Sequence, residues 1–367
     1  MKDVTGASVP TPADAAGGAA PLLSVRNLSV EFQVEGGQVQ AVRDISFDLR
    51  PGEILGLVGE SGSGKSVSMS SLLRLNPSPP ARITGGSVLF QGTDLLALSE
   101  RQLRRFRGRE IAMVFQDPAM SLNPVQTVGS QITEAMQVHD RGLSRRDARA
   151  RAIELLDLVG VPAPTVRYSQ YPHEFSGGMR QRAMIAMALS NRPKLLIADE
   201  PTTALDVTVQ AQILDLLQDI QREEQVSIIL ITHDIGIIAE VADRVLVMYA
   251  GKVVETAGVG PLFETPLHPY TRGLLASLPR LDAPGGDLPS IPGQPPSLNP
   301  PPSGCAFHPR CSLSAGRERC RTELPDLADA GGQHHVACHF FAELRDSAPP
   351  GAAGEPAATD MDRGYAR

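Results

Sequence analysis

The chain has 367 residues, a formal net charge of −7 at neutral pH and four cysteines. This length is enough for a large core and corresponds most simply to one large domain with an appendage. The acidic balance argues against nucleic acid as a partner, although the arginines between residues 101 and 109 form a local basic cluster. No window approaches eighteen consecutive apolar residues, and no basic segment followed by a hydrophobic run opens the chain, so neither a membrane span nor a secretion signal is predicted.

The N-terminal part of the chain predicts a leader, a small sheet and a buried strand. Residues 1–22 are rich in Ala, Gly, Pro and Thr and are expected to form a disordered leader. Apolar alternation over residues 28–32 and 45–49 then predicts an antiparallel sheet. The apolar run 54–58 is typical of a strand buried on both faces, and a helix is expected directly afterwards over 65–75.

A glycine-rich segment between this strand and this helix fits the pattern G-x-x-x-x-G-K-[ST]. Backbone N–H groups of such a loop wrap phosphate oxygens, and the following helix directs its positive end at the same anion. Lys65 is expected to neutralise the β and γ phosphates, and Ser66 to ligate Mg²⁺. The predicted nucleotide-binding residues of this segment are Gly59, Ser61, Gly62, Ser63, Gly64, Lys65, Ser66 and Val67.

The middle of the chain predicts a helical insertion followed by further buried strands. Residues from about 93 to 180 are polar, charged and mostly helical in pattern. Within them Ser144, followed by Asp147, is typical of a helix N-terminus. Apolar runs over 195–198 and 226–231 flank an amphipathic helix, and strands that alternate with helices predict an α/β fold.

Several polar residues stand where predicted strands end. Asp199 closes an apolar strand, where a carboxylate is costly unless it serves a cation, so it is assigned to Mg²⁺; a helix cap is its plainer interpretation. Glu200 is the predicted general base for the attacking water. Gln116 would contact both Mg²⁺ and that water, and His233, with one N–H donor aimed at the γ phosphate, would stabilise charge as it develops. Residues 176–178 open a predicted helix that suits a second phosphate, which indicates a nucleotide shared between two subunits.

The composition changes again from about residue 259. Proline and glycine are dense over 284–302, and the cysteines that follow are spaced C-x₅-C-x₈-C-x₁₇-C, which is not the paired C-x₂-C zinc pattern. Because cytosolic thiols stay reduced, zinc, an iron–sulfur cluster and free thiols are the open alternatives. Further candidate zinc ligands are His308, His334, His335 and His339. We expect a small cysteine-containing domain over 259–345 and a disordered tail over 346–367.

Taken in order, these segments resemble the nucleotide-binding subunits of ABC transporters. The narrower resemblance is to the oligopeptide or dipeptide import ATPases, and it is carried by residues 115–124, by residues 268–271 and by the cysteine segment. It covers about residues 24–340. It implies a P-loop ATPase core of the ABC type over 23–258, with an antiparallel β subdomain and the helical subdomain inserted at about 93–180.

The resemblance also implies how the site residues are used. Two subunits sandwich two ATP molecules, and each site pairs one subunit's glycine loop with the other's signature, here Ser176, Gly177 and Gly178. Asp206 lies in the motif called the D-loop, and Phe32 stands where an aromatic ring usually stacks on adenine. The signature departs from Leu-Ser-Gly-Gly-Gln at Phe175 and Met179. A [4Fe-4S] cluster, with Zn²⁺ as the alternative, is implied at Cys305, Cys311, Cys320 and Cys338.

The implied partners are a second ATPase subunit in a heterodimer, two membrane permease subunits and an external peptide-binding protein, with the chain peripheral on the cytoplasmic face of the membrane. The predicted function is ATP hydrolysis that drives uptake of short peptides. An importer ATPase for another solute such as nickel, an ABC-type nucleic-acid or repair ATPase, and a regulatory module in which ATP is only structural are the alternatives. A repair factor would carry a long coiled coil between glycine loop and signature, where this chain has about a hundred residues of mixed helix.

Overall fold

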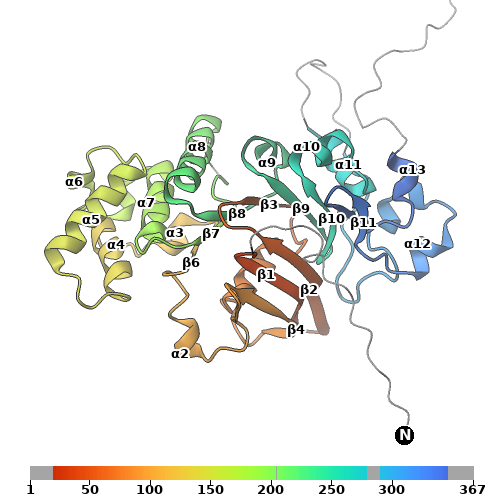
Figure 1. The fold of residues 1–367 in the computed structure, drawn as a ribbon, viewed down its shortest axis with the longest axis horizontal. Coiled ribbons are helices and arrows are strands. Elements are labelled where there is room, and N and C mark those ends of the chain that lie inside the picture. The colour runs from red at the N-terminus through yellow and green to blue at the C-terminus, as the bar shows by residue number, and fades with distance from the viewer. Residues whose placement is uncertain (1–19, 204, 279–289, 346–367) are drawn as a thin grey trace, which may run out of the picture.

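The computed structural model describes residues 20–203, 205–278 and 290–345 (Figure 1). Its strands form two sheets. The smaller sheet is antiparallel and contains, in spatial order, β2 (Gly37–Leu49), β1 (Leu23–Val34), β4 (Ala81–Phe90) and β5 (Thr93–Asp94). The larger sheet has the order β11 (Ala328–Gly331), β12 (His334–Val336), β10 (Lys252–Gly258), β9 (Arg244–Tyr249), β3 (Ile54–Val58), β8 (Ser227–Thr232), β7 (Leu195–Asp199) and β6 (Ile111–Val114).

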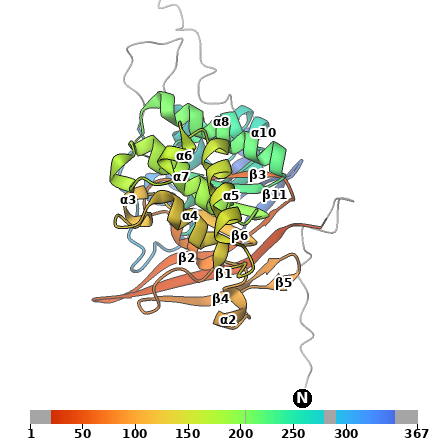
Figure 2. The ribbon, with the colours of Figure 1, turned by 90° about the vertical axis from the view of Figure 1, so that its left-hand side faces the viewer.

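The centre of the larger sheet is buried on both faces. Every residue of β3 is buried, and β3 pairs in parallel with both β8 and β9. Leu55 and Leu57 pack into a core shared with the smaller sheet, whereas Ile54 and Val58 pack into a core shared with the helices. The smaller sheet lies below the larger one in Figures 1 and 2. The continuous apolar run of β3 follows from this arrangement, because neither face of the strand meets water.

Helices cover the rest of the larger sheet and build a lobe at one end of the molecule. In Figure 1 this lobe consists of α4, α5, α6 and α7, and the C-terminal segment lies at the opposite end. The helices up to the end of the lobe are α1 (Lys65–Leu72), α2 (Glu100–Leu103), α3 (Pro118–Ser121), α4 (Val128–Gln137), α5 (Arg145–Leu158), α6 (Pro164–Arg167) and α7 (Gly177–Leu189). The later helices are α8 (Val207–Glu224), α9 (Ile235–Val241), α10 (Val259–Glu264), α11 (Pro269–Ala276), α12 (Glu318–Thr322) and α13 (Phe341–Arg345).

Local sequence signals explain several helix ends. Ser144 caps α5, and its side chain accepts a hydrogen bond from the Asp147 backbone N–H, as the sequence indicates. Helix α1 is shorter than the predicted 65–75, since the chain leaves the helix after Leu72 and Arg74 has a left-handed backbone with φ 50°.

The C-terminal segment extends the larger sheet. Strand β12 pairs antiparallel with β10, and β11 pairs antiparallel with β12. A separate small C-terminal domain is therefore not confirmed. Most of the expected leader (1–19), residues 279–289 and the expected tail (346–367) lie outside the described residues. Within the part of the chain that the structure describes, no helix is long and apolar enough to cross a membrane.

Candidate functional site

The glycine loop connects the carboxyl end of β3 to α1, and its shape depends on glycine. Gly64 has φ 98° and Gly62 has φ 77°, in the left-handed region where other residues are strained. A Cβ at Gly64 would also collide with the backbone carbonyl oxygen of Ala41 in β2. The smaller sheet therefore packs directly against the loop, and only glycine fits at position 64.

The loop lines a cavity of about 670 Å³ at the carboxyl edge of the larger sheet. We call it the phosphate cavity, after the predicted phosphate-binding loop that lines it. Because the parallel strands end at this edge, residues far apart in the sequence meet there. The cavity is lined by Glu60, Ser61, Gly62, Ser63, Gly64, Lys65, Ser66, Val67, Gln116, Glu200, Thr203, His233 and Leu274. It brings together the predicted loop residues, apart from Gly59 at the loop's start, and three of the side chains predicted to act on the phosphate.

Lys65 is held inside the loop. Its Nζ donates to the carbonyl oxygens of Gly59 at 2.6 Å and Glu60 at 3.1 Å, and the residue is 5% exposed. Burial lowers the pKa of Lys65, and the carboxylates of Glu200, Asp199 and Glu60 partly oppose that shift. These carboxylates favour the charged form of the buried Lys65 ammonium.

Ser66 and Asp199 form a pair beside the loop. The Ser66 hydroxyl donates to Asp199 Oδ1 at 2.8 Å, and Asp199 at the end of β7 is 6% exposed. Burial raises the pKa of Asp199, opposed by the Ser66 hydrogen bond, and the nearby Glu200 charge raises it further. A hydroxyl and a carboxylate side by side are hard oxygen ligands of the kind Mg²⁺ prefers, so the residues present fit that ion.

Glu200 is the centre of a hydrogen-bonded group. Gln116 Nε2 donates to Glu200 Oε2 at 2.9 Å, Thr203 Oγ1 donates to the same oxygen at 2.8 Å, and His233 Nδ1 lies 3.4 Å from Glu200 Oε1. The Glu200 backbone has φ 46°, which is unusual for a residue with a side chain and is typical of functional positions. Sequence reasoning missed Thr203, since a threonine three residues after an acid carries no specific signal.

Other predicted residues lie outside this cavity. Phe32, in β1, is half-buried and packs against the core of the smaller sheet, and it does not line the phosphate cavity. Ser176 is exposed and caps α7, accepting from the Met179 N–H at 3.3 Å. Asp206 caps α8 in the same way, accepting from the Val209 N–H at 3.0 Å.

The signature lies close to the start of α8. A Cβ at Gly178 would be 2.7 Å from Val209 Cγ1, and one at Gly177 would be 3.6 Å from the Leu205 side chain. The exposed signature and Asp206 thus belong to one surface that is separate from the chain's own phosphate cavity. Ala204 lies outside the described residues.

The prediction of a [4Fe-4S] cluster at the cysteines is wrong. Among residues 20–203, 205–278 and 290–345, no group of three or more His, Cys, Asp or Glu side chains is placed to hold a metal ion, which also leaves the zinc alternative without a ligand set. The four cysteines line a hollow of only about 10 Å³ together with Phe307 and Phe340. Burial raises the pKa of Cys305 to about 11 and that of Cys338 to about 12, which favours neutral thiols over the thiolates that metals bind.

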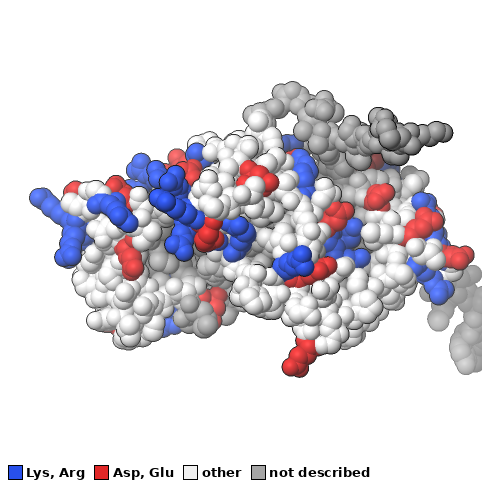
Figure 3. Space-filling model, turned by 90° about the horizontal axis from the view of Figure 1, so that it is seen from below, with Lys and Arg blue, Asp and Glu red and all other residues white. Residues whose placement is uncertain are grey.

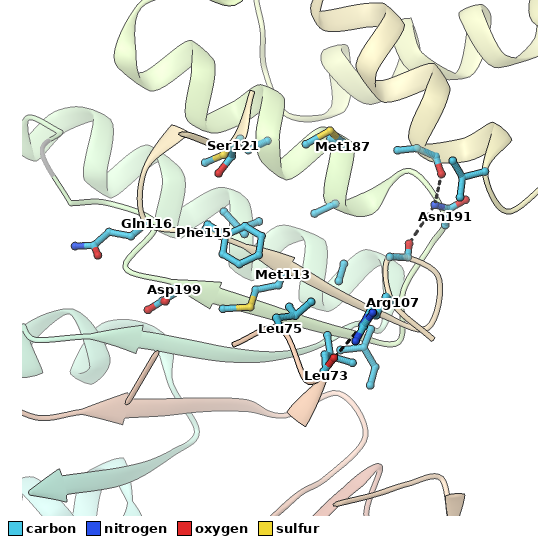
Figure 4. Close-up of a pocket in the computed structure, with 18 of the residues that line it drawn as sticks. Leu73, Leu75, Arg107, Met113, Phe115, Gln116, Ser121, Met187, Asn191 and Asp199 are labelled. Carbon is cyan, nitrogen blue, oxygen red and sulfur yellow. Dashed lines mark hydrogen bonds between the residues drawn. The ribbon is translucent and has the colours of Figure 1, made fainter. Parts of the chain in front are cut away.

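A second, mostly apolar cavity of about 830 Å³ shares Gln116 with the phosphate cavity (Figure 4). It runs between β6, the end of α1 and the helical lobe, and its wall includes Met113, Phe115 and Met187. Phe115 is 43% exposed, which is unusual for so large an apolar side chain. Gln116 lines both cavities, and Asp199 reaches the second one, so this groove adjoins the candidate phosphate site.

The fold and the site together define an ATP-binding cassette, the nucleotide-binding unit of ABC proteins. The solved dimeric structure of a post-hydrolysis state of the ATP-binding cassette MJ0796 bound to ADP and Pi matches with a TM-score of 0.59 and 26% identity, covering 65% of this chain and 98% of that one. The structure of cbiO1 from Clostridium perfringens, part of the ABC transporter complex cbiONQ, matches with a TM-score of 0.56 and 28% identity, covering 66% and 90%. The predicted P-loop α/β core of the ABC type is confirmed.

Comparison with known sequences assigns the chain to a narrower group of proteins. Residues 42–203 match the family model "ABC transporter", and residues 254–320 match "Oligopeptide/dipeptide transporter, C-terminal region". The oligopeptide transport ATP-binding protein OppD of Bacillus subtilis is 56% identical over 80% of this chain and 82% of its own length. A putative peptide import ATP-binding protein of Brucella abortus is 54% identical, over 86% and 93%. The chain belongs to the ABC transporter family, in the group of oligopeptide and dipeptide transport ATP-binding proteins, which confirms the resemblance that the sequence carries.

Proposed function

We propose that this chain binds and hydrolyses ATP and thereby energises a membrane transporter that imports di- and oligopeptides. The observation that carries the proposal is the meeting of the glycine loop, the Ser66–Asp199 pair and the Glu200 group around one cavity. The names of its relatives, which are oligopeptide and dipeptide transport ATP-binding proteins, support the same cargo.

The chemistry follows from the contacts at the cavity. The loop N–H groups and Lys65 bind the phosphates, and Mg²⁺, when bound, neutralises their charge; Ser66, Asp199 and Gln116 would hold it. Glu200 accepts a proton from the attacking water, and the hydrogen bonds from Gln116 and Thr203 fix the orientation of its carboxylate.

His233 completes the site from the other side. It lies 3.4 Å from Glu200, and its side chain is 60% exposed on the cavity side of the strand end, where it can reach the γ phosphate. An N–H hydrogen-bond donor aimed at a γ phosphate oxygen stabilises the negative charge that develops there during hydrolysis. Phe32 is our candidate for stacking on the adenine ring.

We propose that a second ATPase subunit completes each site. Ser176 and Gly177 are exposed, Gly178 is half-buried, and none of the three lines the chain's own cavity, so the N-terminus of α7 is available to a nucleotide held by a neighbour. Asp206 lies on the same surface and would line the seam between the subunits. A heterodimer with a similar ATPase follows from the family resemblance.

The apolar groove beside Gln116 suits the membrane permease subunits. Its exposed Phe115 and the adjoining Val138, 68% exposed, offer an apolar surface for an inserted helix, and the groove shares Gln116 with the phosphate cavity. We propose that the chain lies on the cytoplasmic face of the membrane and that an external peptide-binding protein delivers the cargo to the permeases.

The nucleic-acid alternative is not favoured. In the face shown in Figure 3, Lys and Arg are interspersed with Asp and Glu, at the end where they are densest as well as elsewhere. Relatives that are 56% and 55% identical are named for oligopeptide and dipeptide transport, which also does not favour nickel as the cargo.

Reconstitution tests the proposal. The chain, its cognate second ATPase and permeases are placed in lipid vesicles with the binding protein outside, and ATP hydrolysis inside is measured together with uptake of a labelled peptide. Hydrolysis stimulated by the peptide-loaded binding protein, with uptake that stops in Lys65→Ala, supports the proposal. The proposal would be refuted if the peptide-loaded binding protein did not change the rate of hydrolysis, or if ATP were consumed without peptide uptake.

A further inference from the structure

A single arginine of the C-terminal segment contacts the glycine loop. Arg310 Nη1 lies 2.7 Å from Glu60 Oε2 and Nη2 lies 3.0 Å from Glu60 Oε1, a bidentate ion pair between residues 250 positions apart. The Arg310 side chain is 5% exposed and that of Glu60 is 25% exposed. A shielded, two-bonded pair of this kind holds its partners more firmly than an ion pair at the open surface.

All five N–H donors of the Arg310 guanidinium are used. Besides the two bonds to Glu60, Nη1 donates to the Tyr249 hydroxyl at 3.3 Å, Nη2 to the Ile291 carbonyl at 3.3 Å and Nε to the Pro292 carbonyl at 2.9 Å. The guanidinium also lies 5.9 Å from the centre of the Tyr249 ring. This fixed fork cannot be reproduced by a lysine, which presents one compact charge.

Glu60 is held at its backbone as well. Its N–H donates to the Tyr270 hydroxyl at 2.7 Å, and its carbonyl oxygen accepts from Lys65 Nζ at 3.1 Å. Tyr270, in α11, is fully buried, so its hydroxyl is a rigid acceptor. Glu60 therefore joins two residues of the C-terminal part of the chain to the lysine of the loop, and Leu274, also in α11, adds to the cavity wall.

We propose that Arg310 is a positioning residue for the nucleotide site. Together with Tyr270 it holds Glu60, and through Glu60 it sets the conformation of the glycine loop and the affinity for the nucleoside triphosphate. The inference rests on the proposed ATP site. Without Arg310 the Glu60 carboxylate would lose its cation and turn toward Lys65, and it would then compete with the phosphates for that ammonium. Nucleotide affinity would fall, while the Glu200 group, which Arg310 does not touch, would remain in place.

Equilibrium binding of a fluorescent ATP analogue to the purified full-length chain tests this inference. We expect Arg310→Met to raise the dissociation constant on the order of tenfold, and Arg310→Lys to raise it less, because the charge is kept while the fork is lost. In the reconstituted transporter KM for ATP rises by a similar factor, whereas kcat changes by less than about twofold. A purely structural role would lower thermal stability without changing the dissociation constant.

The matched control is Arg317→Met. Arg317 also makes a bidentate pair in the C-terminal segment, with Glu343 at 2.8 Å for both bonds, but it does not contact the loop. We expect its affinity for the analogue to equal that of the wild type. Adding Arg310→Met to Glu60→Gln should change the affinity by less than about twofold, because the carboxylate that Arg310 restrains is already gone.

The outcomes separate the two proposals. If the wild type and Lys65→Ala bind the analogue equally, the proposed ATP site fails and this inference fails with it. If Lys65→Ala abolishes binding but Arg310→Met and Arg310→Lys bind as tightly as the wild type, only the role of Arg310 is overturned. Fully additive effects of Glu60→Gln and Arg310→Met would also overturn the role of Arg310. If one of the variants Arg310→Met, Arg310→Lys and Glu60→Gln fails to fold, the other two still test this role.

Discussion

The side-chain amide of Gln116 donates a 2.9 Å hydrogen bond to the carboxylate of Glu200, a residue 84 positions further along the chain. Gln116 follows β6 and Glu200 follows β7, which are neighbouring parallel strands. The hydrogen bond directs the carboxylate into the phosphate cavity while leaving its other oxygen facing His233.

Glu200→Gln should abolish hydrolysis without preventing ATP binding. The amide has the shape of the carboxylate but cannot accept a proton from water, so turnover in the reconstituted transporter should fall on the order of 10² to 10³-fold. The analogue's dissociation constant should stay within about threefold of the wild type. Glu223→Gln, an exposed change on α8, is the control and should leave both values unchanged. Normal turnover in Glu200→Gln would remove this residue from the role of base.

Lys65→Ala should impair binding itself. The ammonium is buried between two loop carbonyls and three carboxylates, and its loss removes the charge that faces the phosphates. We expect the dissociation constant for ATP to rise by at least about tenfold, by equilibrium binding. Lys194→Ala serves as control, because Lys194 is 52% exposed and pairs with Glu110 away from the cavity. Unaltered affinity in Lys65→Ala would contradict the proposed site.

Asp199→Asn should make the apo chain more stable and less active. Burial raises the pKa of Asp199 above its unfolded value, so the folded state binds the proton more tightly and the ionised carboxylate destabilises the fold once the pH exceeds that unfolded value. Asparagine keeps an oxygen for the Ser66 hydroxyl and carries no charge. The melting temperature in EDTA at pH 7 should rise, and the difference should vanish as the pH falls below the usual range of an aspartate.

Asp199→Asn should also lose activity, because it should bind Mg²⁺ more weakly. Hydrolysis at fixed Mg²⁺ should drop at least about 10- to 100-fold, and raising the Mg²⁺ concentration should recover part of it. Ser66→Ala is the companion variant, since it removes the other oxygen of the pair. An Asp199→Asn protein that is less stable than the wild type at pH 7 would contradict the assigned cost of the buried charge.

His268 should make the fold acid-sensitive. Burial lowers its pKa to about 4, opposed by the charge of Glu255, and its Nδ1 accepts from the Tyr270 N–H, so the ring is neutral in the fold. The unfolded chain binds this proton at about pH 6.5, and stability should therefore fall as the pH drops from 6.5 to 4, by up to about 1.4 kcal/mol per pH unit from this residue. Urea unfolding over this range measures the slope.

His268→Gln should be less stable at pH 7 but should show a shallower slope between pH 6.5 and 4. His173→Gln, an exposed change, is the control and should keep the wild-type slope. An identical slope in His268→Gln and the wild type would exclude His268 as the source.

Local patterns were sufficient to predict much of the fold. The run 54–58, the glycine loop and the strands at 195–198 and 226–231 are each decided by residues adjacent in sequence, because a doubly buried strand needs continuous apolar residues and a phosphate loop needs left-handed glycines. The parallel arrangement of such strands then brings their ends to one edge. The roles assigned to the residues at that edge stay predictions, although the cavity brings most of those side chains together.

Only the tertiary structure decided the contacts between distant segments. Neither the Glu60–Arg310 pair nor the Thr203 hydrogen bond to Glu200 has a local signal, since each depends on how separate elements pack. The cysteine spacing likewise does not determine where the thiols point, and among the described residues they form no group placed to hold a metal ion. Sequence determines backbone conformations that neighbouring residues enforce, whereas the side chains that meet across the chain depend on the packing of the whole sheet and its helices.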